Sequence, residues 1–582
     1  MKKQFLFFLF CLCAGVSNVW AQETDWSPLF TRVCEGVTYT CENDEAYPWN
    51  LANGCLISTN KAHNSSSTFK ITFSCESAIY FHMKYGTSTE GTYDKLTVVL
   101  DGSTSVCSGS ASSDEFEELQ PGEHVLTLTY SKDGTGSSGS DQVWVSSLSL
   151  FDKETGVPLI DLAAPGQLGE EAVAQFGTLP KVDIVRLKGS LNAEDWKTIK
   201  NMTGLSYLDM TETTVTEIPA EAFTNNRIKT IKWPANLKVI GGKAFYDKYL
   251  KGHLVLPETL DSIGPSAFYR NSIDSVSMPH KQIALANGIF SENTNLETVK
   301  FNSCASYMPS SMFYNCTSLR SVSGTENVKA VYGYAFFHCS ELTSAGTMIP
   351  TTLGDYAFNE CGKLEAIDLS EATSLGERAF LSCKSLKTVD LPKVSSMKEV
   401  CFISCSALTS VSIGDGLSTI PYAAFAGCSA LKTITLGASI SYLDRSAFSG
   451  VSSEKIYINA PTPPGVYGND VFGSTSGTLY VPEYSMVSYK LHDYWSKFTS
   501  VDVNPNPVTS LALNGKLSLT SNARIPDSPN VMMYANGSSF IINGNKEQTL
   551  GRFVAYYNNS ASSSIISRCN NMSSTASEAR YW

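Results

Sequence analysis

A phenylalanine returns every 22 to 24 residues through the middle of this chain. A fixed period of this length indicates a solenoid, in which no coil can bury its apolar face alone and stacked coils can. The period predicts about 12 coils, each adding one parallel strand, with the rings forming a continuous buried spine. The spine comprises Phe223, Phe245, Phe268, Phe290, Phe313, Phe336, Phe358, Phe380, Phe402, Phe425, Phe448 and Phe472.

Cysteines follow the same period. Six consecutive spine phenylalanines are followed three residues later by a cysteine, which gives a ladder of Cys316, Cys339, Cys361, Cys383, Cys405 and Cys428. A buried cysteine usually behaves as a small apolar residue with a weak donor, so we expect the ladder to be structural. Neighbouring rungs of such a stack would also lie at separations that permit an occasional disulfide.

Each repeat runs into a short segment in which apolar and polar residues alternate, such as LKTVDLP at 386–392 and LTSVSIG at 408–414. This period of two places the apolar residues on one face of a strand. The mostly polar residues at the strand centres then form a candidate binding surface, the strand-centre row. Its members are Lys232, Val255, Ser277, Lys300, Ser323, Asp368, Asp390, Ser412, Thr435 and Tyr457. Small polar residues of this kind are equally typical of an ordinary solvated face.

The repeated phrase resembles a known family. IPAEAF at 218–223, LKVIGGKAF at 237–245 and AFLSCKSLKTVDLP at 379–392 resemble the BspA-like (Treponema pallidum type) leucine-rich repeat. The resemblance covers about residues 213–501 and implies a protein-binding solenoid with a cap at each end. Capping is physically required, because an open end would expose the core and unpaired strand edges. We expect the first cap and coils at 155–212, the repeats at 213–458, and the last coil and second cap at 459–502.

Residues 22–152 show a different pattern, with short alternating segments separated by clusters of Gly, Ser and Asp. This pattern predicts an antiparallel β-sandwich. YDKLTVVLDG at 93–102 and the segments after it resemble the MAM-like or cleaved-adhesin jelly-roll modules of secreted Bacteroidetes adhesins, which implies adhesion or carbohydrate binding. Five aromatic residues could stack on sugars or could belong to the sandwich core: Trp49, Tyr80, Tyr85, Tyr93 and Trp144.

The two ends of the chain suggest an exported protein. Residues 1–21 combine two lysines, an apolar run and a small residue at Ala21, which is typical of a cleaved signal peptide. We therefore expect a secreted protein or one on an outer-membrane surface, with no membrane-spanning segment. Residues 503–582 are rich in Asn and Ser, which predicts a partly disordered tail or a small β element.

Export also changes how the remaining cysteines are interpreted. In an oxidising compartment one or two disulfides can form among Cys34, Cys41, Cys55, Cys75 and Cys107, with pairings that the sequence does not define. The loop from Asp133 to Asp141 offers carboxylates but lacks the ligand spacing of an EF-hand, so turn formation explains it without calcium. Calcium in this module is the one cofactor that the resemblance raises.

The chain lacks the usual signatures of an enzyme. HExxH, GxSxG and GxxxxGK[ST] are all absent, the formal charge is −12, and the sequence contains no basic run that would favour nucleic acid. We expect a mainly β, non-enzymatic protein that contacts host or bacterial surface proteins through its repeats. The alternative is carbohydrate binding by the β-sandwich, with the solenoid as a rigid spacer.

Overall fold

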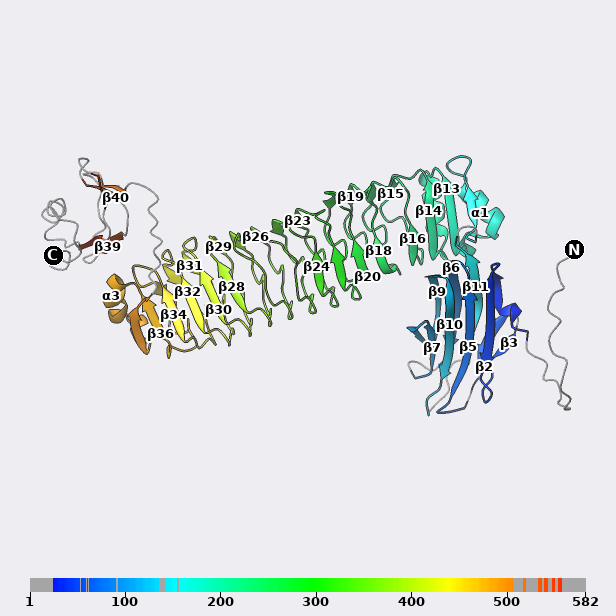
Figure 1. Ribbon diagram of the computed structural model, residues 1–582, viewed down its shortest axis with the longest axis horizontal. Coiled ribbons are helices and arrows are strands. Elements are labelled where there is room, and N and C mark those ends of the chain that lie inside the picture. Colours follow the sequence, from blue (N-terminus) through cyan, green and yellow to red (C-terminus); the bar gives the residue numbers. More distant parts are fainter. Residues whose placement is uncertain are drawn as a thin grey trace. The chain divides into compact units, whose positions relative to one another are not determined.

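The computed structural model describes residues 25–505, except 53, 59, 61, 90–92, 135–141 and 154–155. It also describes five short strands between residues 517 and 556 (Figure 1). The chain divides into two compact units between Leu159 and Ile160. The predicted signal peptide lies outside the described residues, so its prediction stands as it was made.

The first unit consists of two sheets with almost entirely antiparallel pairing. One sheet has the order β3 (Asn50–Ala52), β4 (Cys55–Ser58), β11 (Gln142–Asp152), β6 (Ile79–Ser88) and β9 (Ser110–Leu119), with β1 (Phe30–Val33) parallel to β11. The other has the order β2 (Val37–Asn43), β5 (Ser66–Cys75), β10 (Gly122–Ser131), β7 (Lys95–Leu100) and β8 (Ser103–Ser108). A single turn of 3-10 helix at Ser27–Leu29 precedes β1.

The core of this unit lies between the inner faces of the two sheets. Phe69, Ile71 and Phe73 alternate along β5 and are buried, and Phe81 and Met83 do the same along β6. The rings of Phe73 and Phe81 stack with their centroids 6.3 Å apart. The period-two pattern in the sequence therefore arises from one buried and one outer face in strands such as β5, whereas β6 is buried on both faces. These antiparallel sheets confirm the predicted fold class, whereas the jelly-roll resemblance remains a prediction.

The solenoid begins with a cap that contains two short helices. The elements are β12 (Leu159–Asp161), α1 (Leu168–Phe176), a 3-10 turn at Leu179–Lys181, β13 (Ile184–Gly189), α2 (Ala193–Asn201) and β14 (Tyr207–Thr213). Helix α2 starts with a capping box, because the Asn192 side chain accepts from the N–H of Asp195 while the Asp195 carboxylate accepts from the N–H of Asn192. Strands β13 and β14 are parallel, as in the coils that follow.

Two ladders of parallel strands then extend along the solenoid (Figure 1). The longer strands are β16 (Thr230–Lys232), β18 (Lys251–Val255), β20 (Ser272–Ser277), β22 (Thr298–Lys300), β24 (Ser321–Ser323), β28 (Thr388–Leu391), β30 (Ser410–Ile413), β32 (Thr433–Leu436), β34 (Lys455–Ile458), β36 (Thr478–Val481) and β37 (Ser500–Val503). Between β24 and β28 only isolated bridges at Ser344 and Ala366 continue the ladder. At Gly346 the backbone has a φ of 77°, which ends the extended segment after Ser344.

The second ladder consists of two-residue strands on another side of each coil. They are β15 (Glu217–Ile218), β17 (Val239–Ile240), β19 (Ser262–Ile263), β21 (Ala284–Leu285), β23 (Tyr307–Met308), β25 (Ala330–Val331), β26 (Thr352–Leu353), β27 (Ser374–Leu375), β29 (Ser396–Met397), β31 (Thr419–Ile420), β33 (Tyr442–Leu443) and β35 (Gly465–Val466). In each strand the second residue is apolar, and it faces the core in all but the last. The two ladders hold the coil backbones together along the axis.

The twelve spine phenylalanines lie between these ladders and are all buried. Adjacent rings have centroids 4.7 to 6.0 Å apart along the whole series. Trp196 of the first cap meets Phe223 edge-on, and Trp495 of the second cap meets Phe472 in the same way. Each end of the spine is therefore covered by an indole rather than left open.

The solenoid has about 15 turns, more than the number of phenylalanines predicts. Strands β13 and β14 come before the first phenylalanine coil, and β37 follows the last one, so the caps supply the additional turns. The second cap consists of 3-10 turns at Glu483–Ser485 and Trp495–Lys497 and the helix α3 (Met486–Leu491). The five later strands are β38 (Leu517–Leu519), β39 (Met532–Ala535), β40 (Ser539–Ile542), β41 (Glu547–Thr549) and β42 (Phe553–Tyr556).

Candidate binding surfaces

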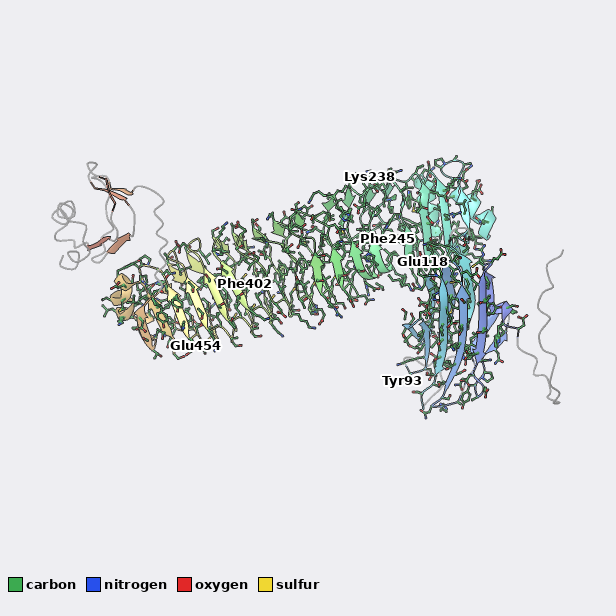
Figure 2. The ribbon with its side chains drawn as sticks, in the orientation of Figure 1. Tyr93, Glu118, Lys238, Phe245, Phe402 and Glu454 are labelled. Carbon is green, nitrogen blue, oxygen red and sulfur yellow. The ribbon has the colours of Figure 1, made fainter. Side chains whose placement is uncertain are left out.

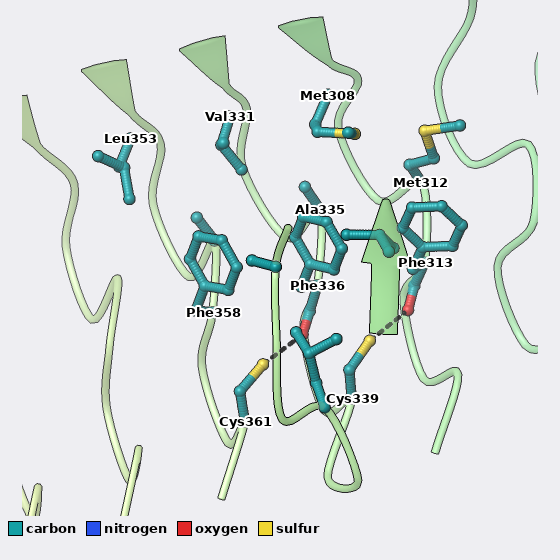
Figure 3. Close-up of a cluster of buried hydrophobic side chains, with 14 of the residues drawn as sticks. Met308, Met312, Phe313, Val331, Ala335, Phe336, Cys339, Leu353, Phe358 and Cys361 are labelled. Carbon is teal, nitrogen blue, oxygen red and sulfur yellow. Dashed lines mark hydrogen bonds between the residues drawn. The ribbon is translucent and has the colours of Figure 1, made fainter. Parts of the chain in front are cut away.

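The six ladder cysteines bind the backbone of the preceding coil. Each Sγ donates to the carbonyl oxygen of the phenylalanine one coil back, over 3.0 to 3.2 Å, as Figure 3 shows for Cys339 and Cys361. All the cysteines within the described residues are free thiols. Burial raises the pKa of the Cys316 thiol far above its usual range, so the reactive thiolate is suppressed. The geometry is that of a structural ladder.

Asparagine takes the place of cysteine in the first coils. The side-chain amides of Asn271 and Asn293 donate over 2.8 Å to the carbonyls of Phe245 and Phe268, one coil back. Both asparagines stand three residues after a spine phenylalanine, as the cysteines do. Our sequence analysis missed these two members of the ladder, although the shared spacing was the signal that could have revealed them.

The strand-centre row is divided into two runs. Val255, Ser277, Lys300 and Ser323 lie opposite one another across β18, β20, β22 and β24, and Lys232 lies next to Asp209 of β14. The second run crosses β28 to β37 through Asp390, Ser412, Thr435, Tyr457, Tyr480 and Asp502. Asp368 belongs to neither run, because its coil makes only an isolated bridge at Ala366.

Most of the row consists of small polar side chains that are exposed or half-buried. Its largest feature is Tyr457, whose ring stacks on Tyr480 with the centroids 4.8 Å apart. In the first run, His253 Nδ1 lies 2.6 Å from the hydroxyl of Ser275, and its Nε2 lies 3.2 Å from that of Ser277. Tyr480 and Asp502 extend the row beyond the residues that we predicted from the sequence.

A second surface, which the sequence analysis did not identify, lies at the turns around the spine phenylalanines. We call it the aromatic edge and define it as Tyr314, Tyr334, Phe337, Tyr356 and Arg378. Tyr334 stacks on Tyr356 at 4.7 Å, and Tyr314 stacks on Phe337 at 4.9 Å. The two stacks touch, since the rings of Tyr334 and Phe337 are 5.7 Å apart and inclined at 49°. Tyr334 remains 38% exposed.

Arg378 completes the stack at its far end. Its guanidinium lies 5.3 Å from the ring centroid of Tyr356, and its Nη1 donates to the hydroxyl of that tyrosine. Glu377 lies 2.9 Å from the same guanidinium, and Lys398 pairs with Asp355 over 2.9 Å. The edge therefore combines aromatic faces with a charged rim.

The backbone explains why these side chains align. Tyr334, Tyr356 and Arg378 each stand two residues before a spine phenylalanine and have φ values of 61°, 60° and 54°. In this left-handed conformation the N–H of Tyr334 donates to Asp355 and that of Tyr356 donates to Glu377, along the solenoid axis. Equivalent side chains in neighbouring coils therefore stack directly above one another.

In the first unit, the five candidate sugar-stacking aromatics separate into two groups. Trp49, Tyr80 and Tyr85 are at most 2% exposed and belong to the interior, so the sugar-stacking interpretation was wrong for them. Tyr93 is 66% exposed (Figure 2), and Trp144 is half-buried. Only the last two can meet a ligand.

Two further predictions concern metals and membranes. The acidic loop from Asp133 to Asp141 falls largely on 135–141, outside the described residues, so calcium there stays a prediction. Across the described part of the chain, no group of three or more His, Cys, Asp or Glu side chains could hold a metal ion. No helix among those residues has the length and apolar character needed to cross a membrane.

The repeat sequence matches the model of a known family over part of the chain. The model of the BspA type leucine rich repeat region matches this chain in six copies, over residues 216–343 and 351–475. These residues are BspA-type leucine-rich repeats. The match lies within the part of the chain for which the resemblance was predicted. Comparison with the curated proteins finds no match.

Several solved structures are similar to the chain that carries these BspA-type repeats. A leucine-rich repeat protein from Bacteroides ovatus is 23% identical, covers 54% of this chain and 87% of its own, and has a TM-score of 0.41. A leucine rich cell surface protein from Faecalibacterium prausnitzii is 22% identical, with coverages of 50% and 83% and a TM-score of 0.29. The pneumococcal vaccine antigen PcpA is 14% identical, with coverages of 62% and 86% and a TM-score of 0.27.

Proposed function

We propose that this protein is an exported binding or adhesion protein whose solenoid contacts surface proteins of a host or of other bacteria. The observation that carries the proposal is the aromatic edge. Tyrosine and arginine are among the residues most enriched at the hot spots of protein interfaces. Tyr334, Tyr356 and Arg378 present three such side chains on consecutive coils, at a surface where none of them contributes to the buried spine.

Backbone energetics support this interpretation. A left-handed backbone costs a residue with a side chain about 1 to 2 kcal/mol, whereas glycine adopts it freely. The single Tyr334–Tyr356 stack contributes about 0.5 to 1.5 kcal/mol, which does not exceed the backbone cost of its two residues. Glycine at Tyr334 and Tyr356 would build a coil of similar stability. The two tyrosines therefore contribute little to the stability of the fold. A small contribution to stability is expected of residues that serve binding on a repeat scaffold.

The strand-centre row is the competing surface. Its small hydroxyl and carboxylate groups offer hydrogen bonds but little area to bury, except at the Tyr457–Tyr480 pair. Hot spots need large side chains in a desolvated centre, and the row provides that at one end only. We therefore place the energetic centre of binding at the aromatic edge, with the row as a secondary contact.

The test uses the full exported chain against an array of immobilised host matrix proteins and bacterial surface proteins. Replacing Tyr334 and Tyr356 together by serine should weaken any saturable binding by about 30-fold or more, as expected for two hot-spot residues. The matched control is Tyr249→Ser, which removes a tyrosine that is 54% exposed on the same solenoid but outside the edge. That control should bind as the unmodified protein does.

A second pair of substitutions separates the two surfaces. If Tyr457→Ser together with Tyr480→Ser abolishes binding while the edge variant binds normally, the row is the binding site and the edge is structural. If no variant alters a measured affinity, the solenoid is not the binding element. Absence of saturable binding to every protein on the array would contradict the proposal as a whole.

Export supports this function without defining the final location. The proposal takes residues 1–21 as a signal peptide, and one similar structure is described as a cell surface protein. Multipoint, non-covalent contact with other surface proteins is useful to a protein that is held at a cell surface or released from it. The proposal assigns no catalytic step to any residue.

A further inference from the structure

Trp144 lies in an unusual position on the outer face of a sheet in the first unit. In β11 it lies directly opposite Gly86 of the neighbouring strand β6. A Cβ atom added to Gly86 would lie 2.7 Å from Cζ2 and 2.9 Å from Cε2 of the indole. Only glycine leaves room for the ring there, so the indole rests on the sheet surface rather than standing away from it.

Small polar side chains border this indole on one side, and Lys84 and Asp114 lie in the next row on the other side. Across β6 and β9, Gly86 is opposite Ser112, and the next row on the same face contains Gln142, Ser88 and Ser110. The alternation of side chains along a strand places these residues on the same face as Trp144. Ser110 and Ser112 are exposed, and Gln142 is half-buried. On the other side of the indole, the neighbouring strand contributes Ile57.

The extent of this surface limits what it can bind. A stable protein interface buries about 800 Å² on each partner, with several large anchors around a dry centre. Here one half-buried indole, flanked by a single aliphatic residue, is bordered by hydroxyl and amide groups on one side and by the Lys84 and Asp114 row on the other. That combination fits a ligand of about one ring that has a flat C–H face and several hydroxyl groups.

We propose that Trp144, seated on Gly86, binds a pyranose ring of a neutral oligosaccharide. The C–H face of the sugar stacks on the indole, while Gln142 and the serines of β9 exchange hydrogen bonds with its hydroxyls. This site is separate from the solenoid surfaces and does not depend on the function proposed for them. The proposal also narrows the carbohydrate-binding alternative from five candidate aromatic residues to Trp144.

The test measures binding of neutral hexasaccharides of glucose, galactose, mannose and xylose to the full chain. Calorimetry, together with quenching of tryptophan fluorescence, should detect at least one of these ligands at concentrations up to about 10 mM, a range suited to weak single-ring recognition. Trp144→Ala should weaken that affinity about tenfold or more, and Trp144→Phe should weaken it less. Tyr93→Ala, which removes a more exposed aromatic of the same unit, should leave it unchanged.

Gly86→Ala gives a second readout, because its Cβ would lie 2.7 Å from the indole and 2.9 Å from the Ala111 carbonyl oxygen, so it displaces the ring while keeping the tryptophan. We expect the same loss of affinity as for Trp144→Ala, with an unchanged circular dichroism spectrum. The proposal is overturned if none of the four oligosaccharides binds, or if Trp144→Ala binds as tightly as the unmodified chain. A loss caused by Tyr93→Ala alone would also overturn it, since the site would then lie at Tyr93.

Discussion

Removal of one ring from the spine tests the central feature of the fold. Phe358 is fully buried, and its ring stacks between Phe336 at 4.9 Å and Phe380 at 5.4 Å. Replacement of a buried phenylalanine by alanine costs about 3 to 5 kcal/mol, and the lost stacking on both sides places this position at the upper end. We expect Phe358→Ala to lower the local stability of the solenoid by about 5 kcal/mol.

The loss should be local, because each coil contacts only its neighbours. Hydrogen exchange followed by mass spectrometry can measure it in the full chain, peptide by peptide. About 5 kcal/mol corresponds to more than 10³-fold faster exchange through local opening. We expect that increase in peptides from the coils of Phe336, Phe358 and Phe380, and little change in coils several turns away.

The matched control is Tyr334→Ala in the adjacent coil, which removes a partly exposed aromatic ring of similar size. Because that ring lies at the surface, its removal should change exchange by less than about tenfold. Equal protection in Phe358→Ala and the unmodified protein would show that the spine does not hold the coils together. A uniform loss of protection over all coils would instead refute the nearest-neighbour view of the solenoid.

Two further predictions concern the buried thiols and the closely stacked glycines. Burial raises the pKa of Cys304 to about 12, and it also raises the pKa values of five ladder thiols, those of Cys316, Cys339, Cys361, Cys383 and Cys405. The folded state therefore keeps protons that the unfolded state loses above about pH 9. The free energy of unfolding should therefore decrease as the pH rises above 9, by up to about 1.4 kcal/mol for each thiol and each pH unit. An equal midpoint of urea unfolding at pH 7 and at pH 10 would contradict this prediction. A Cβ at Gly354 would lie 2.5 Å from the backbone N of Gly333, so Gly354→Ala should cost about 1 to 3 kcal/mol in urea unfolding. Gly362→Ala, whose Cβ would have no neighbour closer than 4.0 Å, should be nearly neutral, and a similar cost for both variants would show that the close approach is irrelevant.

The parts of the fold that could be predicted from the sequence are those that repeat. A phenylalanine every 22 to 24 residues defines its own environment, because its neighbours in space are its counterparts in the adjacent coils. The same holds for the strand-centre positions in β20 to β24 and β28 to β34. The number of turns was underestimated, because the cap strands β13, β14 and β37 have no spine phenylalanine.

Features that depend on contacts between unlike residues could not be predicted in this way. Tyr314 and Phe337 stand one residue after a spine phenylalanine, whereas Tyr334 and Tyr356 stand two before one, and most coils have a non-aromatic residue at each of these positions. Their cluster exists only once the coils are stacked. Likewise, the contact between Trp144 and Gly86 depends on the register of two strands that are distant in sequence.

A comparison with Val400 shows how the proposed binding position at Tyr334 differs from a packing position on the same scaffold. Val400 also stands two residues before a spine phenylalanine, with a φ of 54° that is costly for a β-branched residue. Its side chain is only 8% exposed, so the burial of an apolar side chain offsets the backbone cost. Tyr334 pays a similar backbone cost, yet its ring is 38% exposed. A scaffold that constrains φ but not residue type can thus serve packing in one coil and recognition in another, and exposure tells the two apart.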